Sequence, residues 1–186
     1  TLLGLSRRYP GPFLSNLRGL GPLAAVETFL DVFANPALTW QDLGFLRELT
    51  DLPIVLKGIQ HPDDARKAVD CGVDGIVVSN HGGRQVDGAV ASLAALPRVA
   101  QAVGGAVPVL FDSGVRSGAD VVKAIALGAT AVMVGRPYVY GLALAGATGV
   151  AEVLRYLMAE FDLTMALAGC SSVEQIDAGL LQDERE

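Results

Sequence analysis

The chain has 186 residues, of which 51% are apolar and 18% are charged. This composition excludes an intrinsically disordered protein and is sufficient for one buried core. The 14 Lys and Arg residues against 20 Asp and Glu give a net charge of −6 without any basic run, so we expect no nucleic-acid partner.

No uninterrupted apolar stretch approaches the roughly 18 residues that a membrane span requires. The N-terminus also lacks a charged segment followed by an apolar one. We therefore expect a soluble, cytoplasmic protein with no membrane partner. Cys71 and Cys170 match no metal-ligand spacing, and we interpret both as buried thiols.

The two ends of the chain differ from its middle. Residues 1–36 are interrupted by proline and glycine and predict an irregular connecting or lid segment with one short helix near residues 23–33. Thr39 is placed to cap a following helix. Residues 176–186 predict a polar tail whose last residues are solvated and disordered.

Four short apolar runs predict buried strands between these ends, at residues 54–59, 75–79, 107–111 and 131–134. Their hydrophobicity is continuous rather than alternating, which is typical of parallel strands covered by helices on both faces. Helical segments with their own start and stop signals lie between them. The sequence therefore predicts an α/β domain with a parallel sheet over residues 37–175.

Polar residues and glycines follow each predicted strand. They are Lys57-Gly58, residues 79–84 (SNHGGR), residues 112–116 (DSGVR) and Gly135-Arg136. Barrels and open doubly wound sheets both place their chemistry at this edge, but a phosphate site after the last two strands is typical of a barrel. Because a whole barrel has eight strands, four strand-helix units predict the C-terminal half of a TIM (β/α)8 barrel, strands 5–8.

The segments after the last two strands favour a phosphate-bearing ligand. Glycines in residues 112–118 allow backbone N–H groups to approach an anion, and Arg116 and Arg136 supply charge-assisted donors. The alternative is two ordinary glycine turns with solvated arginines.

Three further side chains predict a catalytic centre. His81 follows a strand end beside two glycines and can transfer a proton near neutral pH, and Arg84 offers a planar fork for a carboxylate. Lys57 can hold an anionic cofactor atom or a substrate oxygen. The alternatives are a histidine satisfied by backbone groups, an arginine in a surface ion pair and a lysine that extends to water. His61, beside Pro62, is interpreted as a helix-capping or loop residue without a functional role.

These motifs occur in one order, as Leu56–Gly58, Ser79–Gln85, Asp112–Asp120 and Gly135–Pro137. Together they closely resemble the FMN-dependent α-hydroxy-acid oxidases and dehydrogenases, which include glycolate oxidase, lactate oxidase, lactate 2-monooxygenase and flavocytochrome b2. The resemblance covers about residues 36–170. Residues 35–40 and 111–114 are most similar to the lactate 2-monooxygenase and lactate oxidase branch.

The resemblance implies FMN as cofactor, a small lactate-like L-2-hydroxy acid as substrate, O2 as acceptor and no metal. It implies that His81 is catalytic and that Arg84, together with His81, binds the substrate. Lys57 would stabilise the reduced flavin at its N1/O2 edge, and Arg136 would hold the phosphate. The implied cofactor-binding residues are Lys57, Ser79, Asp112, Ser113, Gly114, Val115, Arg116, Gly135 and Arg136.

Other parts of the family's site cannot be located in the sequence. They are a tyrosine that meets the substrate, polar residues that hold the flavin ring, and an aspartate that pairs with the catalytic histidine. We therefore expect the chain to carry the C-terminal half of the site and to be inactive alone, working as a homo-oligomer or with a complementing N-terminal half. The alternatives are a non-catalytic half-barrel or self-associating scaffold, and a phosphate-binding barrel enzyme that does not use flavin.

Overall fold

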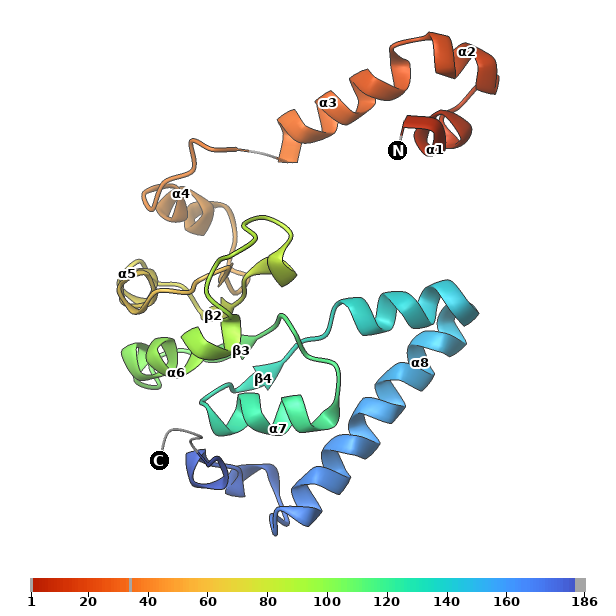
Figure 1. Cartoon of the computed structure of the whole chain (residues 1–186). Helices are drawn as coiled ribbons and strands as arrows, with labels where there is room; N and C mark the ends of the chain where they lie inside the picture. Colours follow the sequence, from red (N-terminus) through yellow and green to blue (C-terminus); the bar gives the residue numbers. More distant parts are fainter. Residues whose placement is uncertain (1, 34, 183–186) are drawn as a thin grey trace. The chain divides into compact units, whose positions relative to one another are not determined.

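The computed structural model describes residues 2–33 and 35–182, and the chain forms two compact units, Thr1–Leu43 and Gly44–Glu186 (Figure 1). The first unit contains α1 (Leu2–Arg8), α2 (Phe13–Arg18) and α3 (Gly21–Phe33). Helix α3 confirms the predicted short helix. Helices α1 and α2 make the segment more regular than predicted.

The buried side chain of Asn16 holds the first two helices together. Its amide nitrogen donates to the backbone oxygens of Ser6 at 3.1 Å and Tyr9 at 2.9 Å. Helices of six or seven residues are too short to show a clear apolar period, so tertiary hydrogen bonds of this kind stabilise them instead.

The second unit is built on a four-stranded parallel sheet in the order β1-β2-β3-β4. The strands are β1 (Val55–Lys57), β2 (Gly75–Val78), β3 (Val109–Phe111) and β4 (Ala131–Val132). The helices are α4 (Asp42–Leu49), which crosses the boundary between the units, α5 (Pro62–Asp70), α6 (Ser92–Val103), α7 (Gly118–Ala126) and α8 (Arg136–Leu167), with single 3-10 turns η1 (His81–Gly83), η2 (Val173–Gln175) and η3 (Ala178–Leu180). The predicted α/β architecture with a parallel sheet is confirmed.

The core lies where α5 and α6 pack on each other and α6 packs on β2 and β3. Ile76 and Val78 of β2 are fully buried, as are Leu96 and Val99 of α6. Burial on both faces is therefore confirmed for the inner strand β2. It is wrong for the outer strand β1, where Val55 is 44% exposed, because β1 has a neighbouring strand on one side only.

Two helix starts carry side-chain caps, whereas Thr39, predicted to cap a helix, instead donates its backbone N–H and its Oγ1 to Asp42 Oδ2 at the start of α4. His61 precedes α5, and its Nδ1 accepts a hydrogen bond from the backbone N–H of Asp63 at 3.2 Å, which confirms its capping role. Ser117 precedes α7 and forms a reciprocal capping box with Asp120. These caps fix where each helix leaves the carboxyl edge of the sheet.

The two cysteines have different environments. Cys170 is buried with Val122, Ala126 and Ile176 in a small apolar cluster. The prediction of a buried thiol is wrong for Cys71, which is exposed because it caps the surface end of α5. Since Ile176 is 7% exposed, the folded structure continues into the predicted polar tail, whose residues 183–186 lie outside the described range.

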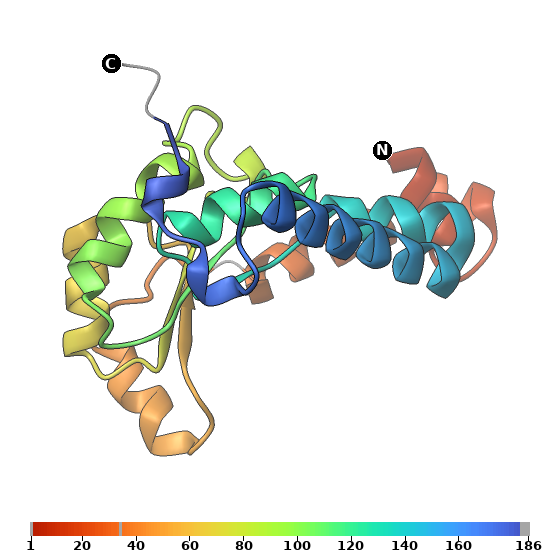
Figure 2. The ribbon, with the colours of Figure 1, turned by 90° about the horizontal axis from the view of Figure 1, so that it is seen from below.

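Among the described residues, α8 is long and apolar enough by length and composition to cross a membrane. It is bent, however, because Ala145 and Gly146 have non-helical backbone angles, and its two arms lie side by side near the kink (Figure 2). The 18-residue stretches that avoid the kink contain Glu152, Arg155, Glu160 and Asp162. Helix α8 instead packs on α7.

The packing of α7 on α8 depends on the absence of a side chain at Gly118. A Cβ there would lie 2.0 Å from the backbone nitrogen of Phe161, and the Gly118 N–H donates to Glu160 Oε2 at 3.0 Å. We expect Gly118→Ala to lower the free energy of unfolding by about 3 kcal/mol, measured by urea denaturation. A Cβ at Gly44 in α4 would meet no atom within 4 Å. Gly44→Ala should therefore raise the free energy of unfolding by about 0.5–1 kcal/mol. Equal effects of the two substitutions would contradict this account of the packing.

Candidate active site

One pocket of about 650 Å³ gathers residues from the carboxyl ends of the four strands. Lys57, His81 and Arg84, predicted from separate motifs, all line it. So do most of the implied cofactor-binding residues, namely Asp112, Ser113, Gly114, Val115, Arg116, Gly135 and Arg136. The structure thus brings together ten of the eleven predicted site residues, and the eleventh, Ser79, lies buried beneath them at 1% exposure.

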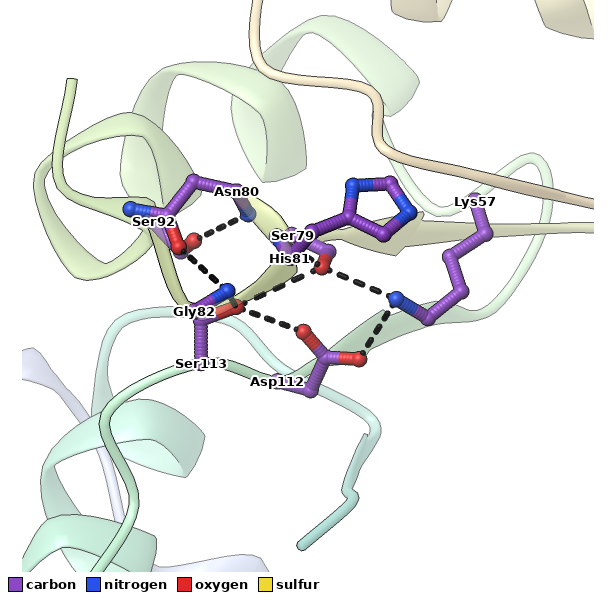
Figure 3. Close-up of polar contacts among 8 residues, drawn as sticks. All are labelled: Lys57, Ser79, Asn80, His81, Gly82, Ser92, Asp112 and Ser113. Atoms are coloured by element: carbon purple, nitrogen blue, oxygen red, sulfur yellow. Dashed lines mark hydrogen bonds and ion pairs between the residues drawn. The ribbon is translucent and has the colours of Figure 1, made fainter. Parts of the chain in front are cut away.

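Lys57 is the last residue of β1 and is paired with a carboxylate. Its Nζ lies 2.9 Å from Asp112 Oδ2 and donates to Ser79 Oγ at 3.0 Å (Figure 3). Asp112 directly follows β3, so the contact spans the end of the intervening strand β2. The lysine is thereby held at the pocket instead of extending freely into solvent.

Asp112 is the carboxylate at the centre of this network. Burial raises its pKa, but hydrogen bonds from Ser79, Lys57 and Ser113 and the charge of Lys57 outweigh burial and leave the pKa below its ordinary value of 3.8. The carboxylate is consequently ionised at neutral pH and compensates the charge of Lys57.

The buried hydroxyl of Ser79 connects Lys57 to the histidine segment. Ser79 Oγ accepts hydrogen bonds from Lys57 Nζ and, at 3.0 Å, from the backbone N–H of His81. Its own proton is then available for Asp112, whose pKa it lowers, or for Ser113 Oγ at 3.4 Å. Ser79 Oγ thus has two donors and two possible acceptors around it.

The turn η1 carries the histidine in a strained backbone conformation. His81, Gly82 and Gly83 have φ angles of 57°, 66° and 73°, all in the left-handed region. The Gly82 N–H donates to Asn80 Oδ1 and to Ser113 Oγ, both at 3.0 Å, and these bonds offset part of the strain. The two glycines after His81 are visible in the sequence and indicate a turn, but the hydrogen bonds of this turn could not be predicted from it.

Space for the imidazole is provided by a glycine at the neighbouring strand end. A Cβ on Gly58 would lie 3.2 Å from His81 Cε1, and Gly58 itself has a φ of +97°. Figure 3 shows the imidazole on the same side of the network as Lys57. The imidazole and the ammonium therefore share one face of the site.

The arginines make the pocket strongly cationic. Lys57, Arg84, Arg116 and Arg136 line it against the single carboxylate of Asp112. Arg136 donates to the carbonyl oxygen of Gly82. A Cβ at Gly82 would lie only 2.7 Å from Nη2 of Arg136. Four cations against one anion, before any charge on His81, suit a ligand with a phosphate or carboxylate group.

The start of α7 differs from the prediction for an anion site. The backbone N–H groups of Arg116 and Ser117 donate to Asp120 Oδ2, both at 3.0 Å, and Gly118 N–H donates to Glu160. The predicted backbone cradle is therefore wrong at the helix start, because carboxylates of the chain itself occupy these donors. In the described part of the chain, the N–H groups of Gly114 and Val115 have no acceptor and stay available.

Sequence reasoning missed several residues of the pocket wall. Met133 and Val134 follow β4 within a run interpreted only as strand, and Tyr140 lies one turn beyond Arg136 on α8. Ser92, at the start of α6, accepts a hydrogen bond from the Asn80 N–H at 2.8 Å and so steadies the histidine segment. The helical spacing between positions 136 and 140 is the one signal that could have indicated Tyr140.

The lowered pKa of Asp112 predicts how its contribution to stability varies with pH. A carboxyl group whose pKa is lower in the folded than in the unfolded protein stabilises the fold at pH values above its pKa in the unfolded protein. This contribution disappears as the pH falls through the pKa of the group in the folded protein. We expect Asp112→Asn to be destabilising at pH 7 and to differ progressively less from the parent protein below pH 3.8. Denaturant unfolding at several pH values tests this, and a difference that grows on acidification would contradict it.

Comparison with known proteins identifies the class to which this fold and site belong. Residues 14–183 match the FMN-dependent dehydrogenase family. The chain belongs to this family of FMN-dependent α-hydroxy-acid oxidases and dehydrogenases, and FMN is the family's cofactor.

Individual relatives are strongly similar to the chain. It is 48% identical over 180 residues to an L-lactate oxidase of Nostoc sp., covering 92% of the chain and 49% of that protein. It is 55% identical over 148 residues to 2-hydroxyacid oxidase 1 of Homo sapiens, covering 80% of the chain and 40% of that protein. A crystal structure of mandelate oxidase with (S)-4-hydroxymandelic acid superposes with a TM-score of 0.72 at 55% identity, covering 74% of the chain and 39% of its own length. The chain spans at most about half the length of these relatives.

The residues of the pocket fit FMN. A volume of about 650 Å³ lies within the roughly 300–1,000 Å³ range of small-molecule and cofactor sites. Arg116, Arg136 and the unpaired N–H groups of Gly114 and Val115 are suitable donors for a phosphate. Lys57 supplies a fixed positive charge in the same pocket.

Proposed function

We propose that residues 37–175 are the C-terminal half, strands 5–8, of an FMN-binding TIM (β/α)8 barrel, with residues 1–36 as a connecting or lid segment and a polar tail near the C-terminus. The sheet supports this because its strands run in sequential order without the reversal of a doubly wound sheet. The coverage of about half of each relative also supports it.

The proposed activity is FMN-dependent oxidation of a small, lactate-like L-2-hydroxy acid, with O2 as acceptor. The product is the 2-keto acid or its decarboxylated derivative. The observation that carries this proposal is the meeting of His81, Arg84 and Lys57 in one cationic pocket. Relatives named L-lactate oxidase and 2-hydroxyacid oxidase give the substrate class its support.

Each side chain has a defined part in this reaction. His81 accepts the proton that the substrate releases, and Arg84 binds the substrate carboxylate through its planar fork. Lys57 stabilises negative charge at the cofactor, while Arg116 and Arg136 hold the phosphate. When bound, FMN supplies the two-electron acceptor that these residues lack.

The partner supported best is the other half of the barrel. Strand β1 has Val55 44% exposed, and its outer edge has no neighbour among the described residues. Unpaired parallel edges and exposed apolar residues favour association with further strands. We propose a complementing N-terminal half or a homo-oligomer as the active form, in the cytoplasm, with the isolated chain inactive.

Mixing this chain with the N-terminal half of the Nostoc sp. L-lactate oxidase tests the function. After addition of FMN and removal of oxygen, we expect L-lactate to bleach the visible flavin band and D-lactate to leave it unchanged. Glycolate and mandelate in parallel samples would define the size of the substrate. An assembled, flavin-loaded complex that none of these acids reduces would contradict the proposal.

A second candidate, a non-catalytic, self-associating half-barrel, is favoured by the exposed apolar residues of α8, such as Leu144 at 88% and Leu167 at 81%. Light scattering of the isolated chain distinguishes it. A concentration-dependent rise in mass, without flavin binding in the presence of the other half, would support the scaffold.

A further inference from the structure

Ser113 has a backbone conformation that its side chain does not favour. Its φ of 82° lies in the left-handed region, where glycine is accommodated with less strain. Among the described residues, His81 is the one other non-glycine residue with a positive φ. The two strained residues belong to adjacent loops, after β3 and β2, and hydrogen bonds connect these loops directly (Figure 3).

The hydroxyl of Ser113 makes that connection. Ser113 Oγ donates to Asp112 Oδ1 at 2.8 Å and accepts the Gly82 N–H at 3.0 Å. Asp112 in turn pairs with Lys57. Ser113 Oγ therefore joins the Gly82 end of the histidine turn to Asp112, beside the separate link that Ser79 Oγ makes between the His81 N–H and Lys57.

We propose that Ser113 is a positioning residue for His81, fixing the His81–Gly82 turn relative to the Lys57–Asp112 ion pair. The inference rests on the proposed function, since His81 is taken as the proton acceptor. The hydroxyl uses its only proton on Asp112 and a lone pair on Gly82, so its hydrogen-bonding capacity is directed at protein groups. Small displacements of a catalytic group can reduce turnover strongly, which gives such a bridge its effect.

Two substitutions separate the hydroxyl from the backbone strain. Ser113→Gly removes the hydroxyl and relieves the backbone strain. Ser113→Ala also removes the hydroxyl but keeps the backbone strain. Thr130→Val is the matched control, because Thr130 Oγ1 also accepts a backbone N–H, that of Val109 at 3.2 Å, at the other end of the sheet.

Amide hydrogen exchange of the full chain, followed by NMR, gives a readout that needs no flavin. We expect the Gly82 amide to exchange at least about twofold faster in both Ser113 variants, because one of its two acceptors is lost while Asn80 Oδ1 remains. The chain has two histidines, so the imidazole signal of His81 should move while that of His61 stays in place. Thermal unfolding should show Ser113→Gly to be at least as stable as the parent and Ser113→Ala less stable. Thr130→Val should leave the Gly82 and His81 signals unchanged.

Kinetics of the complex with the complementing half give the functional readout. Both Ser113 variants should retain FMN and lower kcat about tenfold with a smaller change in KM for the acid. Unchanged Gly82 exchange and an unmoved His81 signal in Ser113→Gly would overturn the proposal, as would an unchanged kcat. A parent complex that binds FMN but is never reduced would instead refute the proposed function, and the exchange data would still decide whether Ser113 holds the turn.

Discussion

Replacing His81 by asparagine is expected to reduce turnover of a 2-hydroxy acid by about 10²–10⁴-fold, the usual contribution of a general base. Asparagine tolerates the left-handed conformation that His81 adopts at φ 57°, so the change removes the titratable ring without adding backbone strain. The measurement is kcat of the complex between this chain and the complementing half, with FMN bound.

The matched control is His61→Asn. His61 caps α5 from outside the pocket, and asparagine is itself a favourable capping residue, so turnover and stability should stay close to those of the parent. FMN retention should be the same in both variants. Normal turnover of the His81→Asn protein would remove His81 from the mechanism.

Arg84→Lys is expected to raise KM for the acid and to lower kcat/KM by about a hundredfold or more, because lysine keeps the charge but loses the two parallel donors that match a carboxylate. Arg84 is exposed and forms no salt bridge with a carboxylate among the described residues, so its fork is available for a ligand. Steady-state kinetics over a range of L-lactate concentrations provide the test.

The control for this substitution is Arg66→Lys on the exposed surface of α5. Arg66 pairs with Asp63 one helical turn away and lies outside the pocket, so kcat/KM should stay unchanged. If both arginine variants behaved alike, or if Arg84→Lys affected only FMN retention, Arg84 would not be the residue that binds the acid.

Most of the fold of residues 54–134 could be predicted from the sequence because local signals agree with tertiary structure there. The apolar run at 75–79 is the buried strand β2, and His61, interpreted from the sequence as a capping residue, caps the start of α5. Residues 2–18 could not be predicted in the same way. Their short helices depend on the contacts of Asn16, which are specified by tertiary packing and leave no periodic pattern.

For the candidate site, the sequence predicts the side chains but not their connections. Lys57, His81 and Asp112 each follow a strand, and parallel strands bring their carboxyl ends to one edge, so their meeting in one pocket follows from topology. The pairing of Lys57 with Asp112 and the bridging by Ser113 depend on the directions in which these side chains point, which the sequence does not specify. Those directions depend on backbone angles at Ser113 and His81 that are unusual for these residue types.

The most direct test of the account is FMN retention by the chain assembled with the N-terminal half of the Nostoc sp. L-lactate oxidase. After gel filtration, the account predicts one FMN per complex, with the visible band eluting together with the protein. Substituting glutamine at both Arg116 and Arg136 should release the flavin without dissociating the two halves. A stable complex of the two halves that elutes colourless in the presence of excess FMN would contradict the claim that this pocket is part of a flavin site.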